Sequence, residues 1–344
     1  MKTDTLLTIG IPIFNGEETI EQTLQSILVA KEKIDDKKIE ILISDNCSKD
    51  KTIFKINNFL KKNNLLARMN INDSNLGYDK NIEKIIEESN SLFIWFLGCG
   101  EKITPHSLEI ILEKIQKNKD LTNIVLNFDI YNETDKNFTS NELKLDQDTI
   151  LFGENFSLNR YSLALSANIV SKIKWLEASK NPLTIEDWCH VERIAEMILN
   201  KNSSSLLIKE SCFTLLREKK GWWSHPQACE QVTNHIVFMK NLSKKNNDNK
   251  KVHTEFIRLR NNSRSFLLSS IIYRKLNHDN FSQDEKKNIY QKLRQELKMD
   301  NLFLLTFLIL INSPRRIIIF LSFFKEILKK IKNVLNDPFN LSHT

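Results

Sequence analysis

The stretch Thr8–Leu28, TIGIPIFNGEETIEQTLQSIL, decides the fold class. An apolar, β-branched run reaches Ile13 and is then broken by FNGEE. Beyond this break, apolar residues recur at helical spacing, which predicts an amphipathic helix. These residues are Ile20, Leu24, Ile27 and Leu28. The order of strand, turn and helix is one unit of an α/β fold.

The same alternation continues to about residue 120. Further predicted strands are IEILISD, ARMNIND and LFIWFL, and apolar residues at helical spacing follow each of them. Alternation of this kind predicts a mainly parallel sheet with helices on both faces. In open sheets of this type, ligands bind at the carboxyl ends of the strands. Polar residues follow three of the predicted strands at those ends, namely Asn15, Asp45, Asn46 and Glu101.

The pattern changes after residue 121. A strand NIVLNFDIY is predicted, and a helix follows TIEDW with Trp188, Val191, Ala195 and Ile198 on one face. Beyond Arg217 the chain is predicted to be largely helical, so we expect an α/β domain with a helical C-terminal extension. The predicted ranges are 1–220 for the α/β domain, 221–300 for the helical extension and 301–344 for an amphipathic tail.

The composition favours a globular protein. The chain has 344 residues, of which 41% are hydrophobic, and a formal charge of +7 from 50 basic and 43 acidic residues. Because the surface is mixed in charge and basic residues cluster only near the C-terminus, we predict no nucleic-acid partner. Five cysteines without a CxxC pair favour reduced thiols. The α/β part of the chain is therefore predicted to be cytoplasmic.

The tail has two apolar pieces separated by NSPRR. Neither piece has the roughly 20 residues that a membrane-spanning helix needs. From Phe320 onward an apolar face is predicted, with lysines mostly on other faces, which suits the surface of an anionic membrane. The apolar face comprises Phe324, Ile327, Leu328, Ile331 and Leu335. The alternative is a helical pair that packs on its own domain or on a second copy.

Four stretches together resemble family 2 glycosyltransferases of the GT-A fold, which is Rossmann-like. They are TIGIPIFNGEETIEQTLQSIL, EILISDNCSKDKT, NLGYDKNI and FIWFLGCGEKI, in that order. In detail the chain is similar to the abequosyltransferase-like subgroup, which contains sugar transferases of bacterial surface polysaccharides. The resemblance covers about the first 220 residues. It implies an enzyme that uses a nucleotide-sugar donor.

The resemblance also implies a set of nucleotide-binding residues. Asp45 matches the family carboxylate that accepts the N–H of the base, and NLGYDKNI matches the donor-side pattern N-x-G-x-D-x-N. The full set is Pro12, Phe14, Asn15, Glu17, Asp45, Asn46, Asn75, Gly77, Asp79 and Asn81. Asn15 with Gly16 is also typical of a turn or a helix cap, and Asp45 of a capping or turn aspartate.

The loop GCGE departs from the family pattern. Members of the family end this strand in aspartates, the last of which binds a divalent metal, whereas Cys99, Gly100 and Glu101 stand here. Glu101 keeps one oxygen ligand of the type that Mg²⁺ or Mn²⁺ accepts together with substrate phosphates. We therefore predict a divalent metal at Glu101, with His225 as a weaker candidate ligand. The alternative is that Glu101 only begins the next helical region.

Glu186 and Asp187 resemble the family's acidic pair. Inverting transfer needs a base for the acceptor hydroxyl, which we assign to Asp187, with Glu186 as a supporting acid. Two acids are also common at a plain helix start. Trp222 and Trp223 lie in a basic stretch and are predicted to form a lid or acceptor loop, unless they pack within the helical region.

The resemblance thus predicts an inverting glycosyltransferase with a nucleotide-sugar donor and a glycan or lipid-linked acceptor, peripheral on the inner face of the cell membrane through its tail. The alternative is a non-catalytic GT-A module that binds a glycan or a partner glycosyltransferase. The GCGE loop suggests this alternative because it lacks two of the carboxylates that the family has there.

Overall fold

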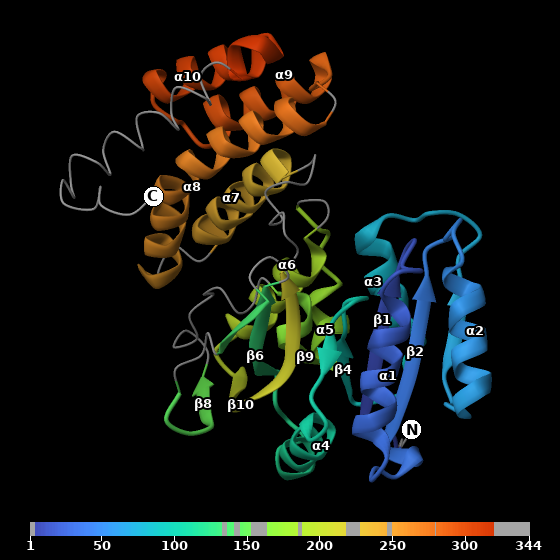
Figure 1. Cartoon of the computed structure of the whole chain (residues 1–344). Helices are drawn as coiled ribbons and strands as arrows, with labels where there is room; N and C mark the ends of the chain where they lie inside the picture. The colour runs from blue at the N-terminus through green and yellow to red at the C-terminus, as the bar shows by residue number, and fades with distance from the viewer. Residues whose placement is uncertain are drawn as a thin grey trace, which may run out of the picture. The chain divides into compact units, whose positions relative to one another are not determined.

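The computed structural model describes residues 4–132, 136–140, 145–152, 164–184, 188–217, 228–245, 250–278 and 280–319. The chain divides into two compact units (Figure 1). The first unit is Met1–Lys219 with Asp248–Val252, and the second unit is Lys220–Asn247 with His253–Thr344. The ranges 1–220, 221–300 and 301–344 stay predictions.

The first half of the sheet is parallel, as the sequence predicts. Its strands are β1 (Leu7–Ile13), β2 (Ile39–Asp45), β3 (Arg68–Ile71) and β4 (Phe93–Phe96). They lie in the order β3-β2-β1-β4, and Leu7 is in register with both Ile39 and Phe93. The carboxyl ends of β1 and β2 therefore meet at one edge, where Ile13 pairs with Asp45.

The second half of the sheet is mixed. A short strand, β9, runs antiparallel between β4 and β6, and β6 is parallel to β10. Three short strands, β5, β7 and β8, add antiparallel pairs to β10 or β6. The strands are β5 (Lys102–Ile103), β6 (Asn123–Asn132), β7 (Asn137–Ser140), β8 (Thr149–Phe152), β9 (Asn168–Ser171) and β10 (Ser204–Arg217).

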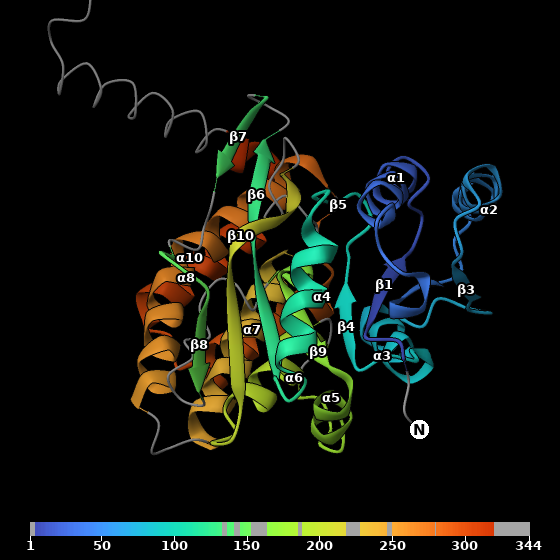
Figure 2. The same cartoon turned by 90° about the horizontal axis from the view of Figure 1, so that it is seen from below.

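Helices cover both faces of the sheet, so that α1 and α3 lie on opposite sides of β1 (Figure 2). One face packs against α1 (Ile20–Lys31), α2 (Thr52–Asn63) and α4 (Ser107–Lys117), and the other against α3 (Tyr78–Glu88), α5 (Lys172–Ala178) and α6 (Cys189–Ile198). Strand β4 shows the alternation that this requires. Phe93 and Trp95 belong to the first apolar cluster, whereas Ile94 and Phe96 belong to the second.

Gly10 explains how α3 comes so close to β1. A Cβ atom at this position would lie 2.5 Å from Cγ2 of Ile85, which is buried in α3. A glycine lets the helix pack directly on the strand backbone. The start of α3 is thereby brought next to the carboxyl ends of β1 and β2.

The second unit is helical, which confirms the predicted helical extension. Its helices are α7 (Ala228–Lys245), α8 (Lys250–Asn277), α9 (Gln283–Gln291), a π-helical turn η6 (Lys292–Glu296) and α10 (Asn301–Asn312). Arg274 of α8 donates to both oxygens of Glu285 in α9, and Lys275 donates to the carbonyl of Ile311 in α10. Within the part of the chain that the structure describes, no helix is both long and apolar enough to cross a bilayer.

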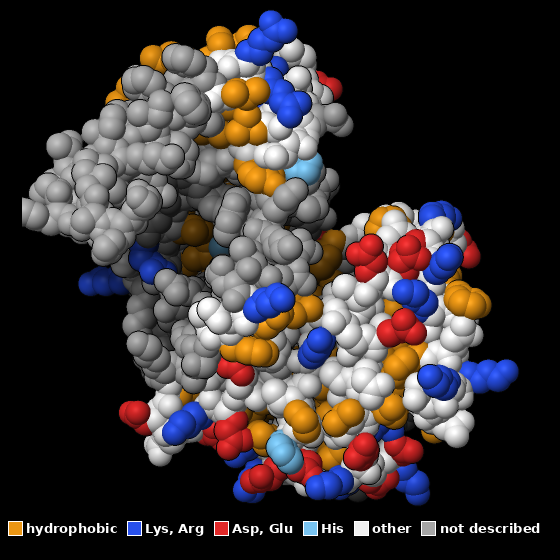
Figure 3. All heavy atoms as spheres, in the orientation of Figure 1, with side chains coloured by type: hydrophobic (Ala, Val, Ile, Leu, Met, Phe, Trp, Pro, Cys, Tyr) orange, Lys and Arg blue, Asp and Glu red, His pale blue; other side chains and the backbone are white. Residues whose placement is uncertain are grey.

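Acidic and basic side chains are interspersed over the face of the first unit in Figure 3. All five cysteines are free thiols, as the sequence predicts.

Candidate functional site

Two loops interlock at the carboxyl ends of β1 and β2. The backbone N–H of Asn46 donates to the carbonyl of Ile13 at 2.8 Å. Asn15 donates its backbone N–H to Ser48 Oγ at 2.8 Å, and its Oδ1 accepts from the N–H of Lys49 at 2.9 Å. Asn15 has a φ of 51°, a conformation that asparagine tolerates better than most residues. The predicted turn role of Asn15 is therefore real, and it shapes the edge of the site.

Glu17 strengthens the same junction. Its backbone N–H donates to Asp50 Oδ2 at 3.1 Å, and its own Oε2 accepts from the N–H of Lys51 at 2.9 Å. Pro12 is half-buried within β1, and Phe14 is 48% exposed at the top of the loop. The side chain of Glu17 thus fastens the loop, while the ring of Phe14 remains open to a ligand.

Asp45, the last residue of β2, is fully buried. Its Oδ2 accepts from the N–H of Ser48 at 2.9 Å. Its Oδ1 is also buried and has no hydrogen-bond partner among the described residues. A buried acceptor left without a donor costs about 1–3 kcal/mol. Oδ1 of Asp45 can therefore accept a hydrogen bond from a donor that the described residues do not supply.

Four amide side chains form an asparagine cluster below this edge: Asn46, Asn72, Asn75 and Asn81. Asn46 donates to Asn75 Oδ1 at 2.8 Å, and Asn72 donates to Asn46 Oδ1 at 3.2 Å and to Asn81 Oδ1 at 3.0 Å. Asn81 also exchanges hydrogen bonds with the hydroxyl and the carbonyl of Ser44. The cluster joins the ends of β2 and β3 to the start of α3.

Gly77 and Asp79 lie just beyond the cluster. Gly77 precedes α3 with a φ of 84°, and its carbonyl accepts from the amide of Asn46 at 3.2 Å. Asp79, in the first turn of α3, accepts from the backbone N–H of Cys189 at 2.9 Å. Of the predicted nucleotide-binding residues, Asp79 is therefore the one whose carboxylate contacts α6.

The GCGE loop, Gly98–Glu101, lies at the carboxyl end of β4. Glu101 is half-buried, and its Oε2 accepts from the hydroxyl of Ser166 and from the N–H of Gly98, the latter at 3.1 Å. Burial raises the pKa of the Glu101 carboxyl, although the hydrogen bonds from Ser166 and Gly98 act in the opposite direction. Glu101 is thus held in place by partners before any ligand binds.

The backbone geometry of this loop accounts for its glycines. Gly100 has a φ of 104°, and its N–H donates to Thr23 Oγ1 at 2.9 Å; Thr23 in turn donates to the carbonyl of Glu101. A Cβ at Gly98 would lie 3.0 Å from Oε2 of Glu101. The positive φ at Gly100 favours glycine there, and a side chain at Gly98 would require the carboxylate of Glu101 to shift.

Glu101 is the acidic residue that the GCGE loop offers to a divalent cation. No group of three or more metal-ligating side chains occurs in the described ranges. Ser166 and Gly98 both donate to Oε2 of Glu101, and hydrogen bonds of this kind orient a ligating carboxylate. The donor set fits a cation whose other ligands are phosphate oxygens and water, as Mg²⁺ accepts.

Five predicted site residues lie outside the described residues: Glu186, Asp187, Trp222, Trp223 and His225. Their assignments stay predictions. The described neighbours of the acidic pair are Thr184 and Trp188, and α6 begins at Cys189.

Several residues at the site were not singled out from the sequence: Ser44, Asn72, Ser166 and Glu192. The asparagine-rich run NINDSN at residues 70–75 is a signal that points to Asn72. Ser166 lies 65 positions from Glu101, in a short 3₁₀ helix (Leu165–Ala167), and nothing in its local sequence indicates the contact.

Comparison with known proteins finds a matching family and similar chains. Residues 8–174 match the model of glycosyl transferase family 2. Abequosyltransferase RfbV from Salmonella typhimurium is 31% identical over 117 residues, which cover 34% of this chain and 34%, or about a third, of that relative.

Solved structures of TarS from S. aureus share the fold. The complex with UDP-GlcNAc matches with a TM-score of 0.60 and 14% identity over 90% of this chain and 91% of that chain. The complex with UDP matches with a TM-score of 0.53 and 13% identity over 87% and 73%. The chain therefore matches glycosyl transferase family 2 over residues 8–174, and its first unit has the GT-A fold.

Proposed function

We propose that the chain is an inverting glycosyltransferase that moves a sugar from a nucleotide-diphosphate sugar to a glycan or lipid-linked acceptor during bacterial surface polysaccharide synthesis. The family match and the similarity to an abequosyltransferase support the reaction class. The related fold of TarS, which was solved with UDP and with UDP-GlcNAc, favours uridine as the base.

The observation that supports this proposal most directly is the unpartnered Oδ1 of Asp45. The base of a uridine or thymidine nucleotide has one imide N–H, which is a donor of the kind this oxygen lacks. Phe14, exposed on the neighbouring loop, offers an aromatic face to the base. Both residues lie at the carboxyl edge of the sheet, where ligands of open α/β sheets bind.

The remaining roles follow the chemistry of transfer. Asp187 takes the proton of the acceptor hydroxyl, and Glu186 supports it. Glu101, oriented by Ser166, is the protein ligand of a divalent cation, which stabilises negative charge on the leaving diphosphate when it is bound. Trp222 and Trp223 contact the acceptor or close over the donor.

We propose that the protein lies in the cytoplasm, at the inner face of the membrane. The apolar face predicted from Phe320 onward lies outside the described residues, and α10 precedes it in the chain. In α10 three apolar side chains recur at helical spacing and face solvent: Leu302 is 75% exposed, Leu305 55% and Ile309 55%. Arg315 and Arg316 follow them and are also exposed. An apolar face beside basic residues suits the surface of an anionic bilayer.

Calorimetric titration with UDP tests the nucleotide site. We expect UDP to bind the wild type and to bind Asp45→Ala about 10- to 100-fold more weakly, because a hydrogen bond to a charged group contributes about 1.5–3 kcal/mol. Asp73→Asn is the matched control, since Asp73 is exposed on the loop after β3. Equal affinity in Asp45→Ala and the wild type contradicts the assigned base contact.

Turnover separates the enzyme from the alternative, a non-catalytic module. A panel of UDP- and dTDP-sugars is incubated with wild type and with Asp187→Asn, and the release of nucleoside diphosphate is followed. Release that disappears in Asp187→Asn supports the enzyme. Nucleotide binding without any release, with every donor of the panel, favours the module.

A further inference from the structure

A cavity of about 180 Å³ lies at the amino ends of β6 and β10. Thr122 and Ser203, which directly precede these two strands, line it, and both are buried. Strand β4 is parallel to β1, and β9 is antiparallel to both β4 and β6, so that β6 runs in the direction of β1. The cavity is therefore at the opposite edge of the sheet from Asp45.

The buried part of the lining combines apolar side chains with hydroxyl groups. Ala178 and Met197 line the cavity and belong to the apolar cluster of α3, α5 and α6. The hydroxyl of Thr122 accepts from the N–H of Ser204 at 3.1 Å, and its own proton can be donated to another acceptor. A ligand in this cavity therefore meets both apolar contact and a hydrogen-bonding group.

Asn123, the first residue of β6, brings further polar atoms to this region. It is fully buried, and neither its Oδ1 nor its Nδ2 has a hydrogen-bond partner among the described residues. It pairs with Val170 of β9 and lies two positions from Val125, and both valines belong to the same apolar cluster as Ala178. Its side chain is therefore on the sheet face that α5 and α6 cover. Unpaired buried amide atoms are costly, which favours a polar guest with both donors and acceptors.

The more exposed part of the lining consists of polar and charged side chains from α5, from α6 and from the residues after each helix. They are Lys174, Glu177, Asn181, Glu196 and Asn200. Amide groups both donate and accept hydrogen bonds, lysine donates and ionised carboxylates accept. The set suits a ligand whose groups also do both.

The charges around the cavity balance. Nη1 of Arg193 lies 3.4 Å from Oε2 of Glu196 and compensates that carboxylate. Lys174 and Glu177 remain, one positive and one negative. Because a charged ligand would meet no excess of the opposite charge here, this lining favours a neutral ligand.

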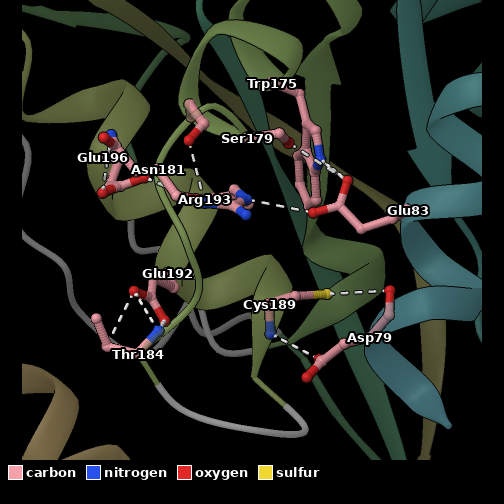
Figure 4. A network of polar contacts seen from close by, with 11 residues as sticks. Asp79, Glu83, Trp175, Ser179, Asn181, Thr184, Cys189, Glu192, Arg193 and Glu196 are labelled. Atoms are coloured by element: carbon pink, nitrogen blue, oxygen red, sulfur yellow. Dashed lines mark hydrogen bonds and ion pairs between the residues drawn. The ribbon is translucent and has the colours of Figure 1, made fainter.

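The same arginine holds the wall of the cavity in place (Figure 4). Nη1 of Arg193 donates to the carbonyls of Ala178 and Asn181 at 3.1 and 2.8 Å. Its Nε donates to Oε1 of Glu83 in α3 at 3.2 Å, and the other oxygen of Glu83 accepts from Trp175 of α5 at 2.8 Å. The end of α5 and the turn after it thus have a fixed shape before a ligand binds, which lowers the entropic cost of binding.

The size of the cavity selects among neutral polar ligands. An engineered protein cavity of about 150 Å³ holds one benzene ring, so the present cavity has room for one six-membered ring. A pyranose ring has hydroxyl groups that donate and accept, and C–H groups that suit the side chains of Ala178 and Met197.

We propose that this cavity binds one neutral sugar residue of a glycan, at a site separate from the carboxyl edge of the sheet. The further assignment of that glycan to the acceptor rests on the proposed function, whereas sugar binding itself does not.

Saturation-transfer NMR on the full chain tests the proposal, with the methyl glycosides of glucose, galactose, mannose and N-acetylglucosamine as probes. We expect at least one probe to bind with a Kd on the order of 1 mM. The double variant Glu177→Ala, Asn181→Ala should weaken that binding about 10-fold, because it removes two hydrogen-bonding groups of the lining. Both side chains belong to exposed residues, so the fold is expected to remain intact.

The matched control is the double variant Glu87→Ala, Asn202→Ala. It removes the same two residue types at exposed positions that do not line the cavity, and it should bind the probe as the wild type does. A probe that the lining variant and the control bind equally well is held elsewhere, and this result overturns the proposal.

Two further arms decide where the sugar binds and in which form. A signal that saturating UDP does not displace supports a site apart from the carboxyl edge, and a signal that UDP displaces overturns it. Binding of the free reducing sugars without their methyl glycosides contradicts a glycan, since a sugar residue within a chain has a substituted anomeric oxygen. No signal from any of the four glycosides also overturns the proposal.

Failure of the proposed function gives a different result. In that case UDP does not bind and no nucleotide sugar is turned over, whereas the comparison of the lining variant with its control still decides whether the cavity binds a sugar.

Discussion

The hydroxyl of Ser166 donates to the carboxylate of Glu101 across 65 positions of sequence. The same hydroxyl accepts from the N–H of Gly98 at 2.9 Å, so that one serine fixes both the start and the carboxylate of the GCGE loop. The single acidic residue of this loop therefore has a defined position although its neighbours, Cys99 and Gly100, offer no oxygen ligands from their side chains.

The first prediction concerns the metal. We expect Mn²⁺ to tighten UDP binding to the wild type, and we expect this gain to vanish in Glu101→Ala, because Glu101 is the proposed protein ligand of the cation. Calorimetry with UDP, with and without Mn²⁺, measures both. Ser166→Ala retains the carboxylate but not its orientation, so part of the gain remains. A gain that survives intact in Glu101→Ala shows that Glu101 is not a ligand.

The second prediction concerns Gly10. Gly10→Ala places a methyl group 2.5 Å from Cγ2 of Ile85 and should lower the free energy of unfolding by about 1–3 kcal/mol, the usual cost of overpacking. Urea denaturation measures the change. In the background Ile85→Ala, which removes the opposing atom, the same substitution should cost less, and a cost that is equal in both backgrounds means that the two residues do not clash.

The third prediction concerns pH. Burial raises the pKa of Glu192 above its ordinary value of 4.5, against the hydrogen bonds from Thr184. Because the native state holds this proton more tightly than the unfolded state, Glu192 lowers stability as the pH rises from 4.5 through the raised native pKa.

Glu192→Gln removes that ionisation and keeps an accepting oxygen for Thr184. Its free energy of unfolding, relative to the wild type, should therefore be more favourable at about pH 7 than at about pH 5. Urea denaturation of both proteins at the two pH values gives the comparison. A difference that is independent of pH indicates that the native and unfolded pKa values of Glu192 are the same.

The fourth prediction concerns the membrane. Combined substitution of Leu302, Leu305 and Ile309 by Glu should abolish co-sedimentation with vesicles that contain phosphatidylserine, because it places charge on the apolar face of α10. These side chains are exposed, so the fold is expected to remain intact. Phe54→Glu, at an exposed apolar residue of α2, is the control. Unchanged vesicle binding by the triple variant contradicts a role for α10.

The sequence predicts the first half of the fold well, for a physical reason. The strand Ile39–Asp45 is mainly apolar and almost entirely buried, and it ends in the polar residue Asp45. The position of Asp45 at the carboxyl edge of the sheet follows from this pattern. The antiparallel course of β9 does not, because the four residues of Asn168–Ser171 are buried on both sides and their composition is the same for either direction.

The contacts at the site are harder to predict. Ser166 contacts Glu101, and Glu192 contacts Thr184, yet each is an ordinary residue in its local sequence. Asp79 matches a family pattern, yet its carboxylate contacts the backbone of Cys189, 110 positions away. Side-chain partners of this kind depend on tertiary packing, which periodicity does not report.

The asparagine cluster has a consequence for how the protein responds to its surroundings. Amide side chains do not gain or lose protons in the range where carboxylates and imidazoles do, so the framework formed by Asn46, Asn72, Asn75 and Asn81 keeps its pattern of donors and acceptors when the acidity of the cell changes. Salt screens it little, since none of its members has a net charge. The hydrogen bonds of the asparagine cluster therefore depend little on pH or ionic strength, and any pH dependence at the carboxyl edge of the sheet comes from the carboxylates around the cluster.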